Sequence, residues 1–250
     1  MQVGFTTVTL RQIKEIEKVV AVASNIGAEC IEWGADVHVK DVETAKRAKK
    51  LCDAAGIDIC SYGSYYRVGS NNMAEWERVC KIASSMGAGI VRVWLGSADS
   101  EKTDEATYSA LVSEVKVMCG IAAEYGITVC PECHGNTYNN NTDAFLKIQK
   151  AVACDNFKTY FQSRYRRKEY DLDRIERTAQ YIDCVHISYS EQLREQFPKI
   201  NPSYINALLD KLKAVGYNKS ILIEFTYYSM QHGLVSCLKR DIAKLKSKVK

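Results

Sequence analysis

The sequence has only three prolines, and it has no serine- and glycine-rich stretch of the kind that forms a flexible linker between domains. No apolar run approaches the roughly 18 residues that a membrane-spanning helix needs. Residues 1–5 do not begin a secretion signal. These absences lead us to expect one domain, covering residues 1–250, that resides in the cytoplasm and has no membrane partner.

A strong charge of either sign is also lacking. The chain carries 34 basic and 30 acidic side chains, which gives a formal net charge of +4. Such a weak overall field argues against nucleic acid as a partner and favours a small soluble ligand.

The ten cysteines form no disulfide pattern. They are spread through apolar segments, as reduced and packed thiols are. The nearest pair, Cys130 and Cys133, reads C-P-E-C. We interpret both as packing residues at a strand end, and a redox or zinc role is the alternative.

What the sequence does contain is one unit that recurs eight times: a short apolar run typical of a buried strand, then a longer segment with helical spacing. In the first helical segment, Ile13, Ile16, Val20 and Ala23 recur every three or four residues. The predicted strands lie near residues 3–7, 30–33, 57–62, 90–95, 127–132, 158–162, 184–187 and 221–225. The predicted helices cover residues 10–25, 42–55, 73–86, 104–125, 142–153, 172–180, 203–215 and 234–246.

Glycine marks the ends of several predicted helices, where it supplies a left-handed turn. These glycines are Gly27, Gly56, Gly87, Gly126 and Gly216. No G-x-G-x-x-G segment follows the first strand, although an open doubly wound sheet would often carry one there. We therefore predict an α/β fold in which the eight units close into a single (β/α)₈ TIM barrel.

Three of the predicted strands end in groups that ionise or bind metals: Glu132, His186 and Glu224. The carboxyl ends of barrel strands meet at one face, so these side chains should share one mouth. Two carboxylates buried beside an imidazole need a counter-charge, which a divalent cation supplies. Oxygen-rich ligation with one imidazole suits Mn²⁺, Mg²⁺, Co²⁺ or Zn²⁺. For each residue alone, an ion pair or a surface position is the alternative.

In the order of these segments the chain resembles the sugar phosphate isomerase/epimerase family, also called xylose isomerase-like barrels. The resemblance is carried by CIEWG at residues 30–34, SYGSYYR at 61–67, VRVW at 91–94 and the three strand ends. It covers essentially the whole chain. It implies an isomerase or epimerase that acts on a small sugar, sugar phosphate or polyol through an enediolate, with Glu132 and Glu224 as the catalytic base and acid.

The same resemblance implies a divalent metal held in order by the fifth to eighth strands, through Glu132, Gln162, His186 and Glu224. The family often has Asp at the second of these positions, where this chain has Gln162. A glutamine carbonyl can ligate a hard cation but brings no negative charge, so we expect weaker metal binding.

Arginine is the natural anchor for a phosphate or carboxylate on the substrate, because a guanidinium matches these groups with two hydrogen bonds. Arg67, Arg92 and Arg164 are the candidates. Arg92 is the strongest of them, because an Arg that points inward from a strand needs an anionic partner. Arg164 begins a basic segment for which a solvated loop is the alternative.

Five further residues are candidate substrate contacts. Tyr65 and Trp94 offer aromatic faces to a sugar, and His134 can orient the substrate. Glu32 and His38 can hydrogen-bond to sugar hydroxyls. For all five, packing in the barrel wall or a structural polar contact is the alternative.

Other functions stay open on the same barrel. A keto-inositol dehydratase or a hydroxy-keto-acid isomerase would use the same metal site. Cleavage of damaged DNA would need more His and Asp ligands for several metals than a chain with four histidines supplies in this arrangement. A non-catalytic sugar-binding barrel would follow if Gln162 had cost the chain its metal. The sequence also leaves open whether the chain forms a homo-oligomer.

Overall fold

The structure is a computed structural model that describes residues 1–163, 168–188, 202–226 and 233–249. Eight parallel strands pair in the order β5-β4-β3-β2-β1-β8-β7-β6. Their bounds are β1 (Gln2–Thr6), β2 (Cys30–Gly34), β3 (Asp58–Val68), β4 (Ile90–Leu95), β5 (Thr128–Pro131), β6 (Thr159–Gln162), β7 (Ile182–Ile187) and β8 (Ser220–Ile223). Isolated bridges of Val129 to Phe157 and of Glu132 to Tyr160 connect the β5 and β6 regions, so the sheet is a nearly closed barrel.

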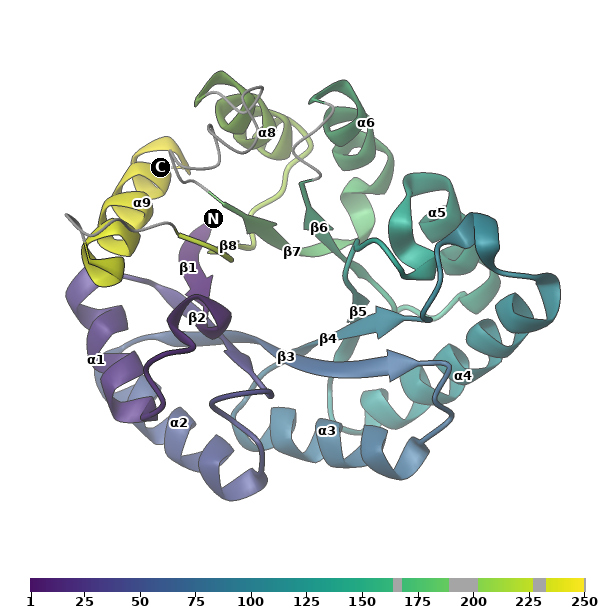
Figure 1. Ribbon diagram of the computed structural model, residues 1–250, viewed down its shortest axis with the longest axis horizontal. Helices are drawn as coiled ribbons and strands as arrows, with labels where there is room; N and C mark the ends of the chain where they lie inside the picture. Colours follow the sequence, from purple (N-terminus) through teal and green to yellow (C-terminus); the bar gives the residue numbers. More distant parts are fainter. Residues whose placement is uncertain (164–167, 189–201, 227–232, 250) are drawn as a thin grey trace.

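Helices form a ring around the barrel (Figure 1). Those within the described residues are α1 (Ile16–Ile26), α2 (Val42–Ala55), α3 (Met73–Ser85), α4 (Glu105–Glu124), α5 (Thr142–Val152), α6 (Lys168–Thr178), α8 (Pro202–Ala214) and α9 (Leu234–Val249). Short 3₁₀ helices are η1 (Thr7–Leu10), η2 (Ser100–Lys102), η3 (Tyr138–Asn140) and η4 (Ala179–Tyr181). The architecture is a (β/α)₈ TIM barrel, so the fold prediction is confirmed. Of the helices in the described residues, none combines the length and apolarity needed to cross a lipid bilayer.

Capping residues explain where several helices begin and end. The side chains of Asp41 and Asn141 accept hydrogen bonds from backbone nitrogens in the first turns of α2 and α5, at 2.7 and 2.9 Å. At the other end, Gly27 and Gly56 follow α1 and α2 with φ angles of 71° and 65°. These left-handed positions are where the sequence predicts helix ends.

The first helix begins later than its apolar spacing predicts, because α1 begins at Ile16 and not at residue 10. Thr9 Oγ1 donates to the backbone oxygen of Glu224 at 2.5 Å. Thr7 Oγ1 accepts a hydrogen bond from the backbone nitrogen of Gly34 at 2.9 Å. These bonds tie the segment after β1 to the ends of the strands on either side of it. Residues 7–10 form the short 3₁₀ helix η1, and residues 11–15 separate it from α1, so the prediction of a helix from residue 10 is wrong.

The strands bury both of their faces. Side chains on the outer face pack against the helices in one large apolar cluster, which includes Phe5, Trp33 and Val185. Side chains on the inner face form a separate cluster of Cys30, Cys130, Tyr160, Cys184 and Leu222. Because side chains alternate along a strand, the residues two positions further on share this inner face. They are Glu32, Glu132, Gln162, His186 and Glu224.

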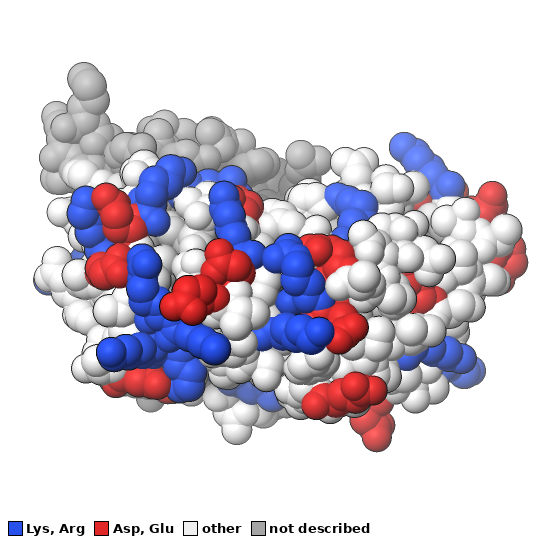
Figure 2. All heavy atoms as spheres, turned by 90° about the horizontal axis from the view of Figure 1, so that it is seen from below, with Lys and Arg blue, Asp and Glu red and all other residues white. Residues whose placement is uncertain are grey.

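Charged side chains of both signs are intermixed over the face that Figure 2 shows. Within the described residues, several charged side chains pair within one helix, such as Lys49 with Asp53 on α2 and Arg78 with Glu75 on α3, both at 2.7 Å. Exposed pairs of this kind contribute little to stability. The mixing of both signs of charge on the face in Figure 2 agrees with the weak net charge of the sequence.

Candidate active site

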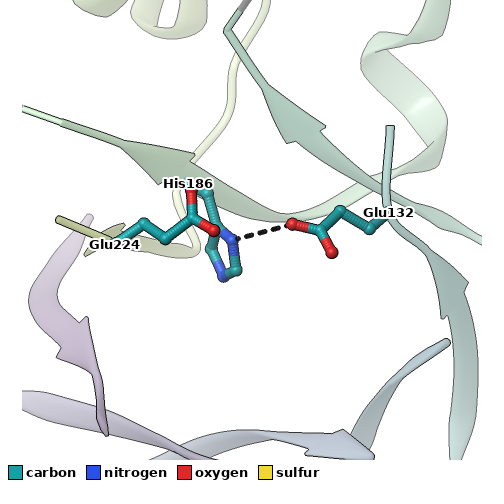
Figure 3. Close-up of side chains that lie close together, drawn as sticks. All are labelled: Glu132, His186 and Glu224. Carbon is teal, nitrogen blue, oxygen red and sulfur yellow. Dashed lines mark ion pairs between the residues drawn. The ribbon is translucent and has the colours of Figure 1, made fainter. Parts of the chain in front are cut away.

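The carboxyl ends of β5, β7 and β8 bring Glu132, His186 and Glu224 together (Figure 3). Each side chain offers one ligand atom, and these atoms lie within 4.8 Å of one another. His186 Nδ1 lies 3.6 Å from Glu132 Oε1, and both side chains are buried. The result is a compact group of two carboxylates and one imidazole at the active-site end of the barrel.

The two carboxylate oxygens of Glu132 contact different residues. Oε2 accepts hydrogen bonds from Arg92 Nη1 and from Trp94 Nε1, the latter at 2.8 Å. Burial raises the pKa of Glu132, but the charge of Arg92 and the contact with His186 outweigh burial and hold the pKa well below its ordinary value. Glu132 is therefore a fixed carboxylate whose Oε1 faces His186.

His186 is almost completely buried and lies between two carboxylates. Its Nε2 is 3.3 Å from Oε2 of Glu32, and its Nδ1 has no hydrogen-bond partner. Burial lowers the pKa of His186, but the negative charge of Glu32 and the contacts with Glu132 and Glu32 raise it to about 10. The carboxylates on both sides of the ring therefore favour the protonated form of the imidazole.

Glu224 is the carboxylate of the group whose pKa is raised. Burial is the main cause, and the negative charges of Glu132 and Glu32 add to it, so the pKa rises to about 7. Gln162 Nε2 donates to Glu224 Oε2 at 2.8 Å. The other atom of this amide, Gln162 Oε1, is buried without a hydrogen-bond partner. Gln162 thus touches the group through its amide nitrogen and leaves a carbonyl oxygen available.

This group fits a divalent cation on two counts. Glu32, Glu132 and Glu224 bring three negative charges and Arg92 brings one positive charge, so a neutral His186 leaves two negative charges unbalanced. A divalent cation would balance them. In addition, His186 Nδ1 and the amide oxygen of Gln162 are buried atoms that lack partners and can each ligate a metal.

Arg92 is expected to bind an anionic group of the substrate, and this role stays a prediction; in the structure the side chain pairs with two carboxylates of the chain itself. The side chain is 4% exposed, and both of its carboxylate partners belong to the chain. Its Nη1 pairs with Glu132, and its Nε lies 3.5 Å from Glu32 Oε1. An Arg that points inward needs an anionic partner, and two glutamates of the barrel supply one.

Glu32 and His38 are both buried and contact other groups of the chain. Glu32 is fully buried inside the barrel, where it contacts His186 and Arg92. His38 is 5% exposed, and its Nε2 lies 2.7 Å from the backbone oxygen of Ile13. These contacts are of the structural kind that the sequence left open as the alternative, and substrate binding by Glu32 and His38 stays a prediction.

Four of the expected substrate contacts gather beside the metal-binding group. Trp94 stacks on His134 with ring centroids 5.3 Å apart, and it lies 5.9 Å from the ring of Tyr65. The guanidinium of Arg67 lies 4.4 Å from the centre of the Trp94 ring. Because Trp94 also donates to Glu132, this cluster of rings borders the candidate metal group directly. The last expected contact, Arg164, lies outside the described residues.

The two cysteines of the C-P-E-C segment, Cys130 and Cys133, are not among the candidate ligands of this group. Cys130 belongs to the inner apolar cluster of the barrel, and Cys133 is buried. Burial raises the pKa of the Cys130 thiol well above its ordinary value, which favours an inert, packed thiol. Within the described residues, the group of candidate metal ligands contains no cysteine.

Two polar residues that line the same interior were not predicted from the sequence. Ser61 Oγ and Tyr160 OH each donate to Glu32 Oε2, at 2.9 and 2.8 Å. Tyr160 precedes Gln162 by two positions on β6, so strand alternation would have placed it on the same inner face. Ser61 follows an irregularity in the β2–β3 pairing, and no simple periodicity would have found it.

The family model described as xylose isomerase-like TIM barrel matches residues 20–246 of the sequence. The chain belongs to this family. No curated protein matches the sequence. The family assignment agrees with the resemblance that the strand ends suggest.

Solved structures support the same fold for this family member. The probable 3-DHS dehydratase AsbF from Bacillus anthracis has a TM-score of 0.77 at 16% identity, covering 98% of this chain and 99% of that chain. D-Psicose 3-epimerase from Clostridium cellulolyticum H10 has a TM-score of 0.77 at 15% identity, covering 100% of both chains. The 3-keto-D-glucoside 4-epimerase YcjR from E. coli has a TM-score of 0.77 at 14% identity, covering 99% of both. At such identities the likeness shows the fold alone.

Proposed function

We propose that the protein is a divalent-metal-dependent isomerase or epimerase of a small sugar, sugar phosphate or polyol derivative. The observation that carries this proposal is the convergence of Glu132, His186 and Glu224 at the mouth of the barrel, in a group whose charge a divalent cation would balance. The names of two structural neighbours, a D-psicose 3-epimerase and a 3-keto-D-glucoside 4-epimerase, support sugar chemistry on this fold.

Glu132, Gln162, His186 and Glu224 would hold the metal, with Mn²⁺, Mg²⁺, Co²⁺ or Zn²⁺ as candidates. When bound, the cation would draw electrons from the carbonyl and hydroxyl oxygens of the substrate and so make the neighbouring carbon-bound proton easier to remove. Gln162 contributes no negative charge, so the site would bind its metal more weakly than a site with three carboxylates.

The proton transfer itself would be the work of Glu132 and Glu224. They reach the group from the ends of β5 and β8, so one can take the proton from the substrate carbon and the other can return it, by way of an enediolate. Arg92 and Trp94 bind one oxygen of Glu132 and thereby fix the direction of the other. The rings of Trp94 and Tyr65 offer faces on which a sugar can stack.

The test is a substrate screen with protein freed of metal by a chelator and then supplied with Mn²⁺ or Co²⁺. Ketoses, aldoses and their phosphates are incubated in deuterium oxide, and NMR detects both isomerisation and deuterium at the reacting carbon. Glu132→Gln and Glu224→Gln should each lower the rate by at least ~100-fold, because each removes a proton-transfer group. Glu124→Gln, an exposed change on α4, is the control. Full activity without metal, or in either active-site variant, would contradict the proposal.

A sugar-binding barrel without catalysis is the second candidate, and the contact of Gln162 favours it. Gln162 Nε2 donates to Glu224 at 2.8 Å, and this hydrogen bond satisfies part of a carboxylate that a metal would otherwise bind. Metal analysis of protein purified without chelator, beside the Gln162→Asp variant, separates the two candidates. Metal in the variant and none in the parent supports the binding protein, whereas metal in the parent supports the enzyme.

A further inference from the structure

Glu32 is a buried carboxylate that the proposed reaction leaves unused. It lies in the middle of β2 and is 0% exposed. Its Oε2 accepts hydrogen bonds from Ser61 at 2.9 Å and Tyr160 at 2.8 Å. The Nε2 of His186 lies 3.3 Å from the same oxygen, and Arg92 Nε lies 3.5 Å from Oε1. Four other strands therefore direct a polar side chain at this one carboxylate.

β3, which lies between β2 and β4, has a glycine where a side chain would lie close to both Glu32 and Arg92. Gly63 on β3 pairs in register with Arg92 on β4. A Cβ atom at this glycine would lie 2.9 Å from Arg92 Nη2 and 3.2 Å from Glu32 Oε1. The missing side chain thus lets the guanidinium reach across β3 to Glu32. A buried charge with this many fixed partners is costly to build, which argues for a role beyond packing.

The two ring nitrogens of His186 lie in different surroundings. Nε2 is 3.3 Å from the carboxylate of Glu32. Nδ1 faces Glu132 Oε1 at 3.6 Å and has no hydrogen-bond partner. A neutral imidazole carries one hydrogen, and an acceptor beside one nitrogen holds the hydrogen there, which leaves the other nitrogen to bind a metal.

We propose that Glu32 is a positioning residue that accepts the hydrogen on Nε2 of His186 and so directs the bare Nδ1 toward Glu132 and Glu224. The inference rests on the metal site of the proposed function and extends it by a residue that touches neither metal nor substrate. It fixes which nitrogen of His186 binds the cation. It also gives a reason for a fully buried carboxylate below the mouth of the barrel.

The first test uses wild-type protein loaded with Zn²⁺ and labelled with nitrogen-15 in its histidines. Ring nitrogen chemical shifts distinguish a protonated nitrogen from a metal-bound one. We expect His186 to carry its hydrogen on Nε2 and the metal on Nδ1. A metal on Nε2, or a hydrogen on Nδ1, overturns the proposal, and this measurement needs no variant to fold.

The second test compares Glu32→Gln with Glu114→Gln by calorimetric titration with Mn²⁺ and Co²⁺. Glu114 is a matched control, because it is also a buried glutamate and accepts hydrogen bonds from Tyr66 OH at 3.1 Å and from the Gly69 backbone nitrogen at 2.6 Å. The dissociation constant should rise about 10- to 100-fold in Glu32→Gln and stay unchanged in Glu114→Gln. Unchanged affinity in a folded Glu32→Gln variant, or an equal loss in both, overturns the proposal.

Failure of the proposed function would look different from failure of this inference. If wild-type protein binds none of Zn²⁺, Mn²⁺ and Co²⁺, both fall. If it binds metal with the opposite arrangement of the His186 nitrogens, the metal site stands and the role of Glu32 falls.

Discussion

Gly63 is the residue on which the buried Arg92–Glu32 contact depends most directly. A methyl group there would meet Arg92 Nη2 at 2.9 Å, so Gly63→Ala must push the guanidinium aside or bend β3. Overpacking of this kind costs about 1–3 kcal/mol, and we expect the free energy of unfolding to fall by that amount. Urea unfolding followed by circular dichroism measures it.

Gly89→Ala is the control for this substitution. Gly89 is exposed, and a Cβ atom there would meet no other atom within 4 Å. Its effect should stay within roughly 0.5 kcal/mol. Equal losses of stability in the two variants would mean that the space beside Arg92 is not what makes Gly63 necessary.

At the residue scale, the sequence predicts which groups face the barrel interior better than it predicts how deep each lies. Glu132 directly follows the last residue of β5, whereas Glu32 lies two residues before the end of β2. This difference places Glu132 at the mouth and Glu32 below it. Depth depends on how neighbouring strands are shifted against each other, and the shift between β2 and β3 occurs at Ile31 and Glu32. Alternation along one strand cannot reveal such a shift.

At the scale of single elements, α4 offers a direct test of helix stability. It has 20 residues, and its Gly120 is exposed with no atom within 4 Å of the position that a Cβ would take. Glycine inside a helix is less stable than alanine by roughly 0.5–1 kcal/mol. Gly120→Ala should therefore raise the free energy of unfolding by about that much, measured by urea unfolding.

The control for α4 is Gly126→Ala, just beyond the end of the helix. Gly126 has a φ angle of 66°, which an alanine adopts only with strain. This variant should lose about 1 kcal/mol or more. A gain in both variants would show that backbone conformation does not decide the effect of glycine in this element.

Asp241 on α9 gives a prediction of pH dependence outside the candidate active site. It is fully buried, and it accepts a hydrogen bond from Thr226 and pairs with Arg240. Burial raises its pKa above the ordinary 3.8, against the effect of these partners. A carboxyl whose pKa is raised on folding contributes stability that is fully present below its unfolded pKa and is lost as the pH rises through its folded pKa.

Asp241→Asn removes this contribution. The free energy of unfolding of the wild type, minus that of the variant, should therefore increase as the pH falls from neutral toward 3.8. Urea unfolding over this range measures the difference. Asp210→Asn, which removes an exposed carboxylate from α8, is the control. A difference that stays flat or decreases with falling pH would contradict the assigned shift.

Element boundaries show where local sequence signals are sufficient. Gly27 and Gly56 end their helices as predicted, because the left-handed turn depends on the glycine itself. The start of α1 was mispredicted, because residue 10 still belongs to η1, and Thr7 and Thr9 of η1 bond to residues 27 and 215 positions away in the sequence. Helical spacing carries no information about such distant partners.

At the scale of the whole molecule, the two ends of the strand order, β5 and β6, are joined only weakly, and this contact is called the β5–β6 join. The β5 and β6 regions are connected by isolated bridges, of Val129 to Phe157 and of Glu132 to Tyr160, whereas the other neighbouring strands pair through longer ladders. The sequence predicts eight strands, but it does not show which pair joins the ends of the sheet loosely. Strand length alone does not decide this, because β5, β6 and β8 all have four residues, and β8 pairs with both of its neighbours over four residues each.

This join lies within the proposed metal site, because Glu132 follows β5 and Gln162 ends β6. A cation held by both residues would tie the two sides together and suppress local opening of the join. Amide hydrogen exchange followed by mass spectrometry should therefore slow more in peptides covering β5 and β6 than in those covering β3 when Mn²⁺ is added. Metal binding that raised only the global stability would slow exchange from the fully unfolded state equally in all strands. If exchange slows equally in the peptides covering β3, β5 and β6, then β5 and β6 do not open locally. The metal would then not stabilise the β5–β6 join specifically.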